Sequence, residues 1–380
     1  MFFRNLNFTQ GFWLLYLRFK GFDLFEIGML ETVFHMTSLS MEVPTGVIAD
    51  VFGRKISRIL GVLSYLLYIV IVLASANFIW VLLGFIFCGL SYTFESGSGD
   101  ALVYDSLKVM NKEDKFMKIN GNKEVIYQIA TSISLFVGGY VAMVSFNLSF
   151  GITAVFYFVA LGLILFMKET PIKKDPEKKN ISQLLYNQYV ISFKVVLRNK
   201  RLFYLIIIGA MMLAPVTSLF LYLPDYLIDL GYSRFEIGIL LGAHSLMAAL
   251  GGYFAHSLEK KYKEKNILYF VPLLMTISFW LILDAKIIYM PFILLGFLES
   301  IFYVVLLDYM NKIIPSEVRA TALSVSGLMF SFVMIIIFPI IGYLGDLYSL
   351  TIGFLVLAII VTLFYVFLLW VLKKNHLQEV

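Results

Sequence analysis

The sequence predicts an all-α membrane protein in which twelve transmembrane helices form two bundles of six. Three observations predict this fold: the composition, a series of twelve hydrophobic runs, and the alternating placement of the basic residues. Of the 380 residues, 60% are hydrophobic and 14% are charged, and the mean hydropathy is +0.87. Soluble proteins have about 45–50% apolar and about 25% charged residues. The composition therefore argues against a soluble enzyme, a nucleic-acid-binding protein and a disordered scaffold.

The hydrophobic runs have the length that a bilayer requires. One transmembrane helix needs about 20 apolar residues, and short polar connections separate the runs, so little of the chain is left for a soluble domain. Each run is expected to form one helix. The runs cover residues 2–18, 26–48, 57–76, 78–107, 117–143, 149–168, 202–228, 235–256, 267–285, 287–311, 318–345 and 350–372.

The basic residues predict the orientation of the chain. If every second connection is taken, starting after the second run, these connections hold 25 of the 30 lysines and arginines. Cytoplasmic loops carry the excess of Lys and Arg in membrane proteins. Both termini are therefore expected in the cytoplasm, and the number of spans is expected to be even.

The longest polar stretch divides the chain into two halves. Residues 1–168 are predicted to form the N-terminal six-helix bundle, residues 169–201 a cytoplasmic linker, and residues 202–380 the C-terminal six-helix bundle. The second part of the linker is either an amphipathic helix on the inner membrane surface or a solvated connection. Its basic residues suit anionic lipid headgroups and give no reason to expect nucleic acid.

The two halves contain an internal repeat. Residues 21–28 (GFDLFEIG) match residues 231–238 (GYSRFEIG) at an offset of 210, and Phe94-Glu95-Ser96 matches Leu298-Glu299-Ser300. In transporters built from two parallel repeats, the substrate site lies between the halves near the bilayer midplane. The same offset would begin the first span before Met1, so we expect the first helix to be truncated at its N-terminus.

A ten-residue motif follows the second run. Gly46-Val-Ile-Ala-Asp50-Val-Phe-Gly53-Arg54-Lys55 closely resembles the Major Facilitator Superfamily signature between its second and third helices, Gly-x-x-x-Asp-x-x-Gly-Arg-Lys. Gly46 would let neighbouring helices approach closely, and Gly53 would permit a tight turn. Asp50 at a helix end could face the positive N-terminus of another helix, while Arg54, Lys55 and Arg58 would lie at the negatively charged inner leaflet.

The resemblance implies a fold, a location and a mechanism. Residues 42–46, 96–107 and 311–324 look like a bacterial branch of the superfamily whose members are described as transporters or drug exporters. It implies a monomeric transporter of the inner membrane, not an enzyme, with a small-molecule substrate, no cofactor and a proton gradient as energy source. Asp50 would latch the two halves by facing the eleventh span, where residues 315–317 begin a helix, and Asp105 and Arg319 would assist at cytoplasmic helix ends.

Two carboxylates are candidates for proton coupling. An ionisable side chain at the bilayer centre costs about 2.5–3.5 kcal/mol on insertion scales, so it is a functional candidate. Counting from the ends of the runs places Glu95 and Glu299 near the midplane. One hypothesis is that one or both exchange a proton for substrate. The alternative is a structural network, in which Arg4 would be the partner of Glu95.

Other buried polar residues give weaker signals. His244 lies within the eighth span, and Glu31 and His35 share one face of the second. Histidine titrates near neutral pH, which suits a proton relay, and a packed, hydrogen-bonded role is the alternative. Only Ser134, Gly138 and Gly139 correspond to the antiporter signature of the fifth span in the superfamily.

No other chemistry is indicated. The four histidines are scattered and Cys88 is the single cysteine, so no metal site is predicted. No phosphate-binding loop or nucleophile elbow occurs. The predicted function is proton-coupled export of small amphipathic compounds by alternating access. The alternatives are uptake of a nutrient by proton symport, and a membrane sensor or inactive remnant on the same fold.

Overall fold

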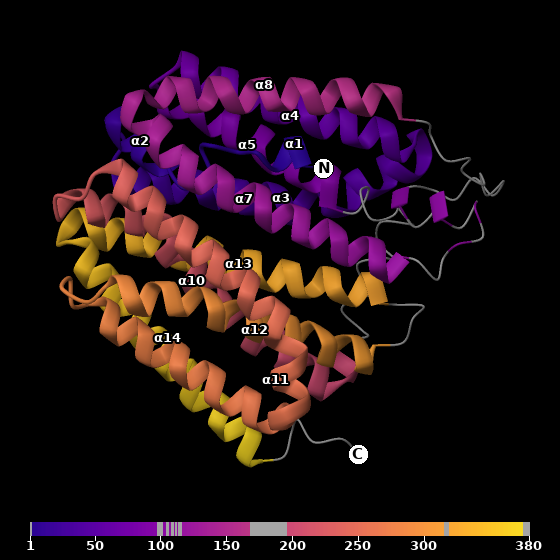
Figure 1. Ribbon diagram of the computed structural model, residues 1–380, viewed down its shortest axis with the longest axis vertical. Helices are drawn as coiled ribbons and strands as arrows, with labels where there is room; N and C mark the ends of the chain where they lie inside the picture. The colour runs from indigo at the N-terminus through magenta and orange to yellow at the C-terminus, as the bar shows by residue number, and fades with distance from the viewer. Residues whose placement is uncertain are drawn as a thin grey trace. The chain divides into compact units, whose positions relative to one another are not determined.

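The computed structural model describes residues 2–96, 102–103, 106–107, 110, 112, 116–167, 196–314 and 319–374, and these residues contain no β-strand (Figure 1). The all-α fold class is confirmed. The helices are α1 (Phe2–Asn5), α2 (Trp13–Phe19), α3 (Leu24–Phe52), α4 (Arg54–Ala74), α5 (Phe78–Ser96), α7 (Phe116–Val144), α8 (Phe146–Phe166), α10 (Lys200–Asp229), α11 (Arg234–Ile282), α12 (Tyr289–Ile313), α13 (Arg319–Leu347) and α14 (Leu350–Lys373).

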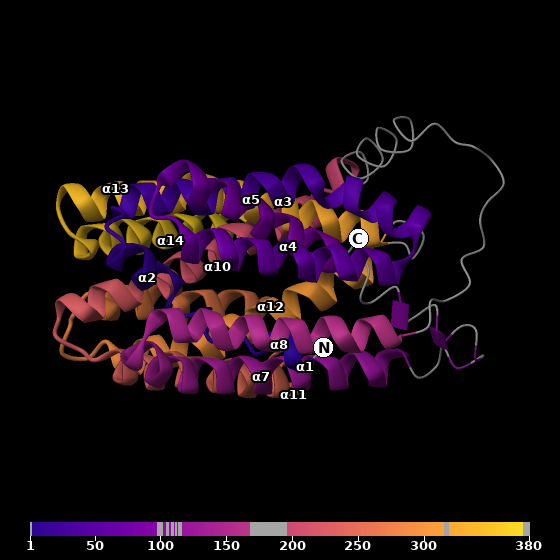
Figure 2. The ribbon, with the colours of Figure 1, turned by 90° about the horizontal axis from the view of Figure 1, so that it is seen from above.

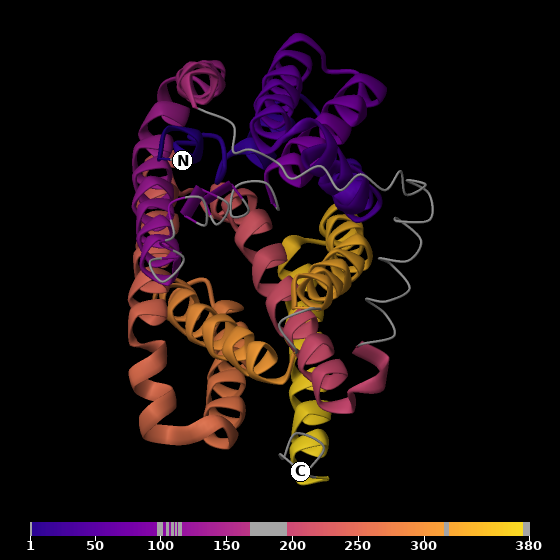
Figure 3. The same cartoon turned by 90° about the vertical axis from the view of Figure 1, so that its right-hand side faces the viewer.

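Nine helices in the described residues are long and apolar enough to cross a membrane. One of them, α11, covers two of the predicted runs, and its ribbon turns back near Lys263, whose φ is 62° (Figure 3). The twelve predicted crossings are thus not all seen as separate helices, and that number stays a prediction.

The described helices belong to two compact units. The first unit contains Met1–Phe22 and Leu30–Asn187, and the second contains Asp23–Met29 and Gln188–Val380. Within each unit the long helices run roughly parallel or antiparallel to one another (Figure 2). The start of α3 therefore packs with the second half of the chain, which the predicted division at residues 169–201 does not anticipate.

The first hydrophobic run does not form one continuous helix. Residues 6–12 separate α1 from α2 in an irregular segment. The Asn7 side-chain oxygen accepts hydrogen bonds from the backbone N–H and the hydroxyl of Thr9, at 3.1 and 2.7 Å. The Phe8 N–H donates to Thr153 Oγ1 at 3.1 Å. Such side-chain bonds compete with the helical backbone ladder, so the expectation of a single helix over 2–18 was wrong.

The irregular segment is enclosed by protein. Leu6, Phe8, Thr9 and Phe12 are each 5% exposed or less. A Cβ at Gly138 of α7 would lie only 2.9 Å from the Phe8 carbonyl oxygen, so glycine is what permits this approach. Non-helical backbone at membrane depth is tolerated where other parts of the protein bury it or where it lines a cavity.

The repeated octets adopt the same turn. Gly21 and Gly231 have φ values of 95° and 89°, which favour glycine. The next helix then starts with a capping box in both repeats. Asp23 and Glu26 exchange hydrogen bonds through their backbone N–H groups and side chains at the start of α3. Ser233 and Glu236 do so at the start of α11.

The first turn of α3 is capped by a carboxylate of α13 within the second unit. Asp346 accepts hydrogen bonds from the N–H groups of Leu24 and Phe25, at 3.0 and 2.7 Å. These N–H groups have no acceptor within their own helix, and the positive end of the helix stabilises the carboxylate. A Cβ at Gly342 would clash with the Leu24 carbonyl oxygen, so only glycine allows this packing.

We expect that replacement of Asp346 by Ala weakens this helix cap by about 1 kcal/mol and accelerates hydrogen exchange of the Leu24 and Phe25 amides about fivefold. Mass spectrometry of the protein in lipid nanodiscs measures this exchange. The control is Asp229→Ala, which removes an exposed carboxylate at the end of α10. Equal exchange at residues 24 and 25 in both variants would contradict the assigned cap.

Candidate functional site

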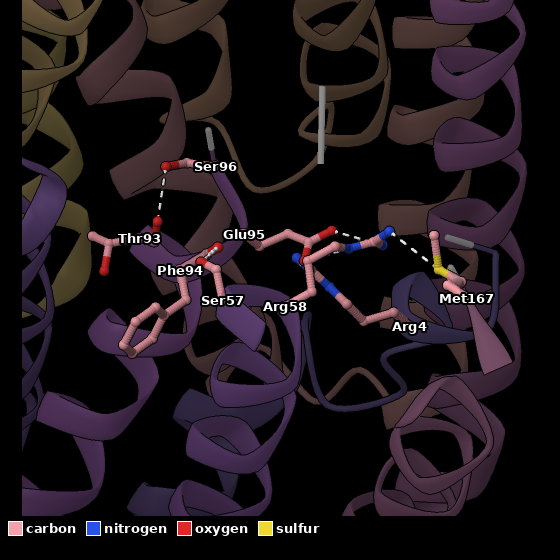
Figure 4. Close-up of polar contacts among 8 residues, drawn as sticks. All are labelled: Arg4, Ser57, Arg58, Thr93, Phe94, Glu95, Ser96 and Met167. Carbon is pink, nitrogen blue, oxygen red and sulfur yellow. Dashed lines mark hydrogen bonds and ion pairs between the residues drawn. The ribbon is translucent and has the colours of Figure 1, made fainter. Parts of the chain in front are cut away.

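Three charged residues of the first unit form an ion-pair cluster, which we call the Glu95 cluster: Arg4 of α1, Arg58 of α4 and Glu95 of α5 (Figure 4). Arg58 makes two hydrogen bonds to the carboxylate, from Nε to Oε2 at 3.2 Å and from Nη2 to Oε1 at 3.1 Å. Arg4 Nη1 lies 2.7 Å from Oε2. The side chains of Arg4, Arg58 and Glu95 are 22%, 11% and 16% exposed, so the cluster is mostly buried.

The backbone of α4 and α5 holds the cluster in place. The Ser57 hydroxyl donates to the Phe94 carbonyl oxygen at 2.7 Å, so the residues preceding Arg58 and Glu95 are also joined. A Cβ at Gly61 would lie 3.3 Å from the carbonyl oxygen of Ser91, so a small residue is needed at this crossing. The bidentate Arg58–Glu95 pair follows from this fixed register of the two helices.

The cluster lies near the start of α4. Arg58 is four residues from Arg54, the first residue of α4, which is about 6 Å along the helix axis. Glu95 is level with the second turn of α4, to which Arg58 joins it. Its expected position near the bilayer midplane stays a prediction.

Aromatic side chains surround the cluster on the side of the irregular segment. Arg4 lies beside the hydroxyl of Tyr157. The Tyr157 ring stacks on Tyr65 with centroids 4.2 Å apart. Asn7 Nδ2 donates to the Tyr65 hydroxyl at 2.7 Å. The break in the first span therefore lies next to the Glu95 cluster, and both belong to the same packed region.

Glu299 and His244 lie together in the second unit. His244 Nε2 is 3.7 Å from Glu299 Oε2, and its Nδ1 is 2.9 Å from the Phe292 carbonyl oxygen. A carbonyl only accepts, so Nδ1 carries the proton and Nε2 faces the carboxylate. Glu299 is ten residues into α12, about 15 Å along the axis, and its expected depth near the bilayer centre stays a prediction.

A third pair is found on α3. His35 Nε2 lies 3.5 Å from Glu31 Oε1, and both side chains are buried. The helical spacing of four residues brings these two groups to the same face, as expected. The six candidate binding residues thus lie in three pairs. The pairs are Arg4 with Glu95, Glu31 with His35, and Glu299 with His244.

The signature loop has the turn that its glycine predicts. Gly53 has φ 113° and separates the end of α3 at Phe52 from the start of α4 at Arg54. Lys55 Nζ donates to the Leu165 carbonyl oxygen at 2.7 Å, near the C-terminal end of α8. The Lys55 charge therefore stabilises a helix terminus within the protein, in addition to any interaction with lipid.

Other expected contacts of the motif are not seen among the described residues or lie outside them. No described atom lies within 4 Å of a Cβ placed on Gly46, so the close helix contact expected at this glycine stays a prediction. The expected latch cannot be followed. Its members outside the part of the chain that the structure describes are residue Asp105, residues 315–317, and the side chains of Asp50 and Arg319.

The sequence interpretation missed the role of Arg58. As a basic residue soon after Arg54 and Lys55 it is expected at the inner membrane surface, but it lies one turn inside α4 and binds Glu95. Its position four residues after Arg54 was a usable signal, because that spacing puts it on the helix rather than in the loop. Lys20 was also missed: its amino group contacts the carbonyl oxygens of Val72, Leu73 and Ser75 at the end of α4.

The Glu95 cluster combines a carboxylate, a group that accepts a proton when it is neutralised, with two guanidinium groups, which are anion-binding groups. A carboxylate that accepts hydrogen bonds from two guanidinium groups loses most of that attraction when it is protonated. Arginine remains charged throughout, so protonation frees both guanidinium groups to bind another anion. Within the described residues, no group of three or more His, Cys, Asp or Glu side chains is arranged to hold a metal ion.

The sequence matches one known protein family and a related protein of that family. A sequence model of the Major Facilitator Superfamily matches residues 5–290. The uncharacterized MFS-type transporter YxaM of Bacillus subtilis (strain 168) is 27% identical, over 91% of this chain and 87% of its own length.

Solved structures share the fold. Nucleoside transporter NupG aligns with a TM-score of 0.78 at 15% identity, covering 98% of this chain and 97% of its own. The D-xylose-proton symporter aligns with a TM-score of 0.74 at 13% identity, covering 97% of this chain and 94% of its own. A bacterial homolog to the human lysosomal transporter Spinster, in an inward-facing and unoccupied conformation, aligns with a TM-score of 0.79 at 16% identity. The alignment covers 98% of this chain and 95% of its own. This chain is therefore a multi-pass membrane protein that belongs to the Major Facilitator Superfamily.

Proposed function

We propose that this protein is a proton-coupled secondary transporter that moves a small amphipathic organic compound across the bacterial inner membrane by alternating access. The observation that carries the proposal is the Glu95 cluster, a mostly buried carboxylate bound by two arginines inside a membrane-spanning unit. A buried charged network in a transmembrane segment marks a substrate or ion pathway. The superfamily to which the chain belongs supports the transport mechanism.

Glu95 is the proposed proton acceptor. In the ionised state it binds Arg58 and Arg4 and holds α1, α4 and α5 together. Protonation weakens both ion pairs, which changes the relative stability of the two states of the transporter. A coupling ion shifts the balance between two states only if it binds one state more tightly than the other. Protonation of Glu95 provides such a difference, because the ion pairs that it weakens join three helices.

We expect Glu95→Gln to remove the pH dependence of transport. Glutamine retains the size of the side chain but cannot exchange a proton. Liposomes containing the protein, a panel of amphipathic compounds and an imposed pH gradient measure the flux. In the variant the gradient should no longer accelerate flux, while exchange without a gradient continues.

The matched control for this experiment is Glu264→Gln. Glu264 is also bound by an arginine, because Arg201 Nη2 lies 2.7 Å from both of its oxygens, but it lies in the second unit and outside the Glu95 cluster. Its replacement should leave the pH dependence intact. If Glu299→Gln, rather than Glu95→Gln, abolished coupling, the proton site would be the His244–Glu299 pair.

We expect Asp50→Asn to reduce transport severalfold without preventing folding or insertion. In the proposed mechanism Asp50 stabilises the state that is closed at the cytoplasmic side through the positive end of a helix, which is worth about 0.3–1 kcal/mol at an exposed site and more when partly buried. Initial rates in liposomes, corrected for the amount of inserted protein, measure the effect. Wild-type rates in Asp50→Asn, compared with Asp229→Asn as control, would contradict the proposed latch.

The direction of transport separates two candidates. The first candidate function is export, and the second is uptake by proton symport. The excess of arginine over carboxylate in the Glu95 cluster favours the second. Deletion of the gene should raise dye accumulation in the first case and limit growth on a solute in the second. A sensor or inactive remnant would give no flux in liposomes with any compound.

A further inference from the structure

The Glu95 cluster contains more positive than negative charge. Two guanidinium groups share one carboxylate, and neither arginine pairs with a second carboxylate in the described part of the chain. The three side chains are between 11% and 22% exposed. A mostly buried cation without a full counter-charge is unfavourable, so this cluster can accept one further anionic group.

The arginines have donors to offer to such a group. Arg58 uses Nε and Nη2 for Glu95, while its Nη1 contacts the Met167 sulfur at 3.9 Å (Figure 4). A thioether is a weak acceptor, and a carboxylate or sulfonate oxygen would bind this donor far better. Arg4 contributes a second guanidinium beside the first, and planar guanidinium groups match the geometry of such anions.

The surroundings suit an organic body attached to the charge. The stacked rings of Tyr65 and Tyr157 lie next to Arg4, and the irregular segment at residues 6–12 is joined to them through Asn7. An aromatic or aliphatic anion would place its charge on the arginines, next to these rings, which are themselves 8% and 5% exposed.

We propose that the Glu95 cluster is a binding site for an organic monoanion, a carboxylate or sulfonate, which binds together with one proton. This inference rests on the proposed function, in which Glu95 is the proton acceptor. Protonation of Glu95 raises the charge of the cluster by one, and binding of a monoanion to Arg4 and Arg58 lowers it by one. The two ligands therefore favour each other's binding, and the coupling is reciprocal.

Cooperative binding of a proton and an anion has a consequence for transport. The loaded cluster has the same charge as the empty one, so the barrier for the conformational change is not raised by an additional buried charge. Proton and anion then cross in the same direction, and an inward proton gradient drives uptake of the anion. The substrate is thus an amphipathic organic anion taken up by symport.

The test measures proton uptake on ligand binding in detergent solution, where no membrane leak of weak acids interferes. Aryl carboxylates and aryl sulfonates are added in weak buffer at a pH where Glu95 is ionised, and their neutral amides and the corresponding arylmethylammonium cations serve as comparison. The wild-type protein should bind the anions and take up as much as one proton per anion. The neutral and cationic compounds should bind at least about tenfold more weakly.

Four variants separate the roles of the residues. Glu95→Gln should bind the same anions without proton uptake. Arg58→Gln and Arg4→Gln should each weaken anion binding about tenfold to hundredfold. If either single arginine variant fails to fold because it leaves Glu95 without its partner, the double variant Arg58→Gln/Glu95→Gln removes both charges and should show neither binding nor proton uptake. The control Arg201→Gln/Glu264→Gln removes a similar pair elsewhere and should behave as wild type.

The outcomes distinguish this inference from the proposed function. Anion binding that is unchanged in the double variant, preferential binding of neutral or cationic compounds, or no binding of any anion in the panel would each overturn the inference. Proton-coupled transport of a neutral or cationic compound that depends on Glu95 would leave the proposed function standing. Anion binding with proton uptake but no flux in liposomes would support the site and contradict the transport function.

Discussion

The pairing of Glu95 with two arginines is the interaction on which the account of the first unit depends. A lone carboxylate in a membrane-spanning helix would be too costly to keep ionised, and Arg58 and Arg4 make it stable. The same contacts join α1, α4 and α5, so the charge state of one side chain affects how these helices hold together. A structural network and a proton site are thus two properties of one arrangement.

Polar groups at helix ends provide the other main constraint. Asp346 caps the start of α3, Lys20 contacts carbonyl groups at the end of α4, and Lys55 does so near the end of α8. Each places a charge opposite a helix terminus of the favourable sign. These contacts satisfy backbone groups that a bilayer cannot satisfy, and they are independent of the hydrophobic match to lipid.

Much of the fold was predictable because hydrophobic runs and turn motifs act locally. The helices over 202–228 and 350–372, the positive φ of Gly53 and the shared turn at Gly21 and Gly231 all follow from short segments. The break after α1 could not be predicted, since it depends on Thr153, which is distant in sequence. The Arg4–Glu95 pair was one of two interpretations of the sequence, whereas Arg58 as the main partner of Glu95 depends on the packing of α4 on α5.

The central claim is that Glu95 changes its protonation state under conditions in which the protein is folded. Infrared difference spectroscopy of the protein in lipid, between a high and a low pH, detects the carbonyl stretch of a protonated carboxylic acid directly. The account predicts a band in the wild-type spectrum that is missing from the spectrum of Glu95→Gln and grows when a bound organic anion is present. Identical difference spectra for the two proteins would contradict it.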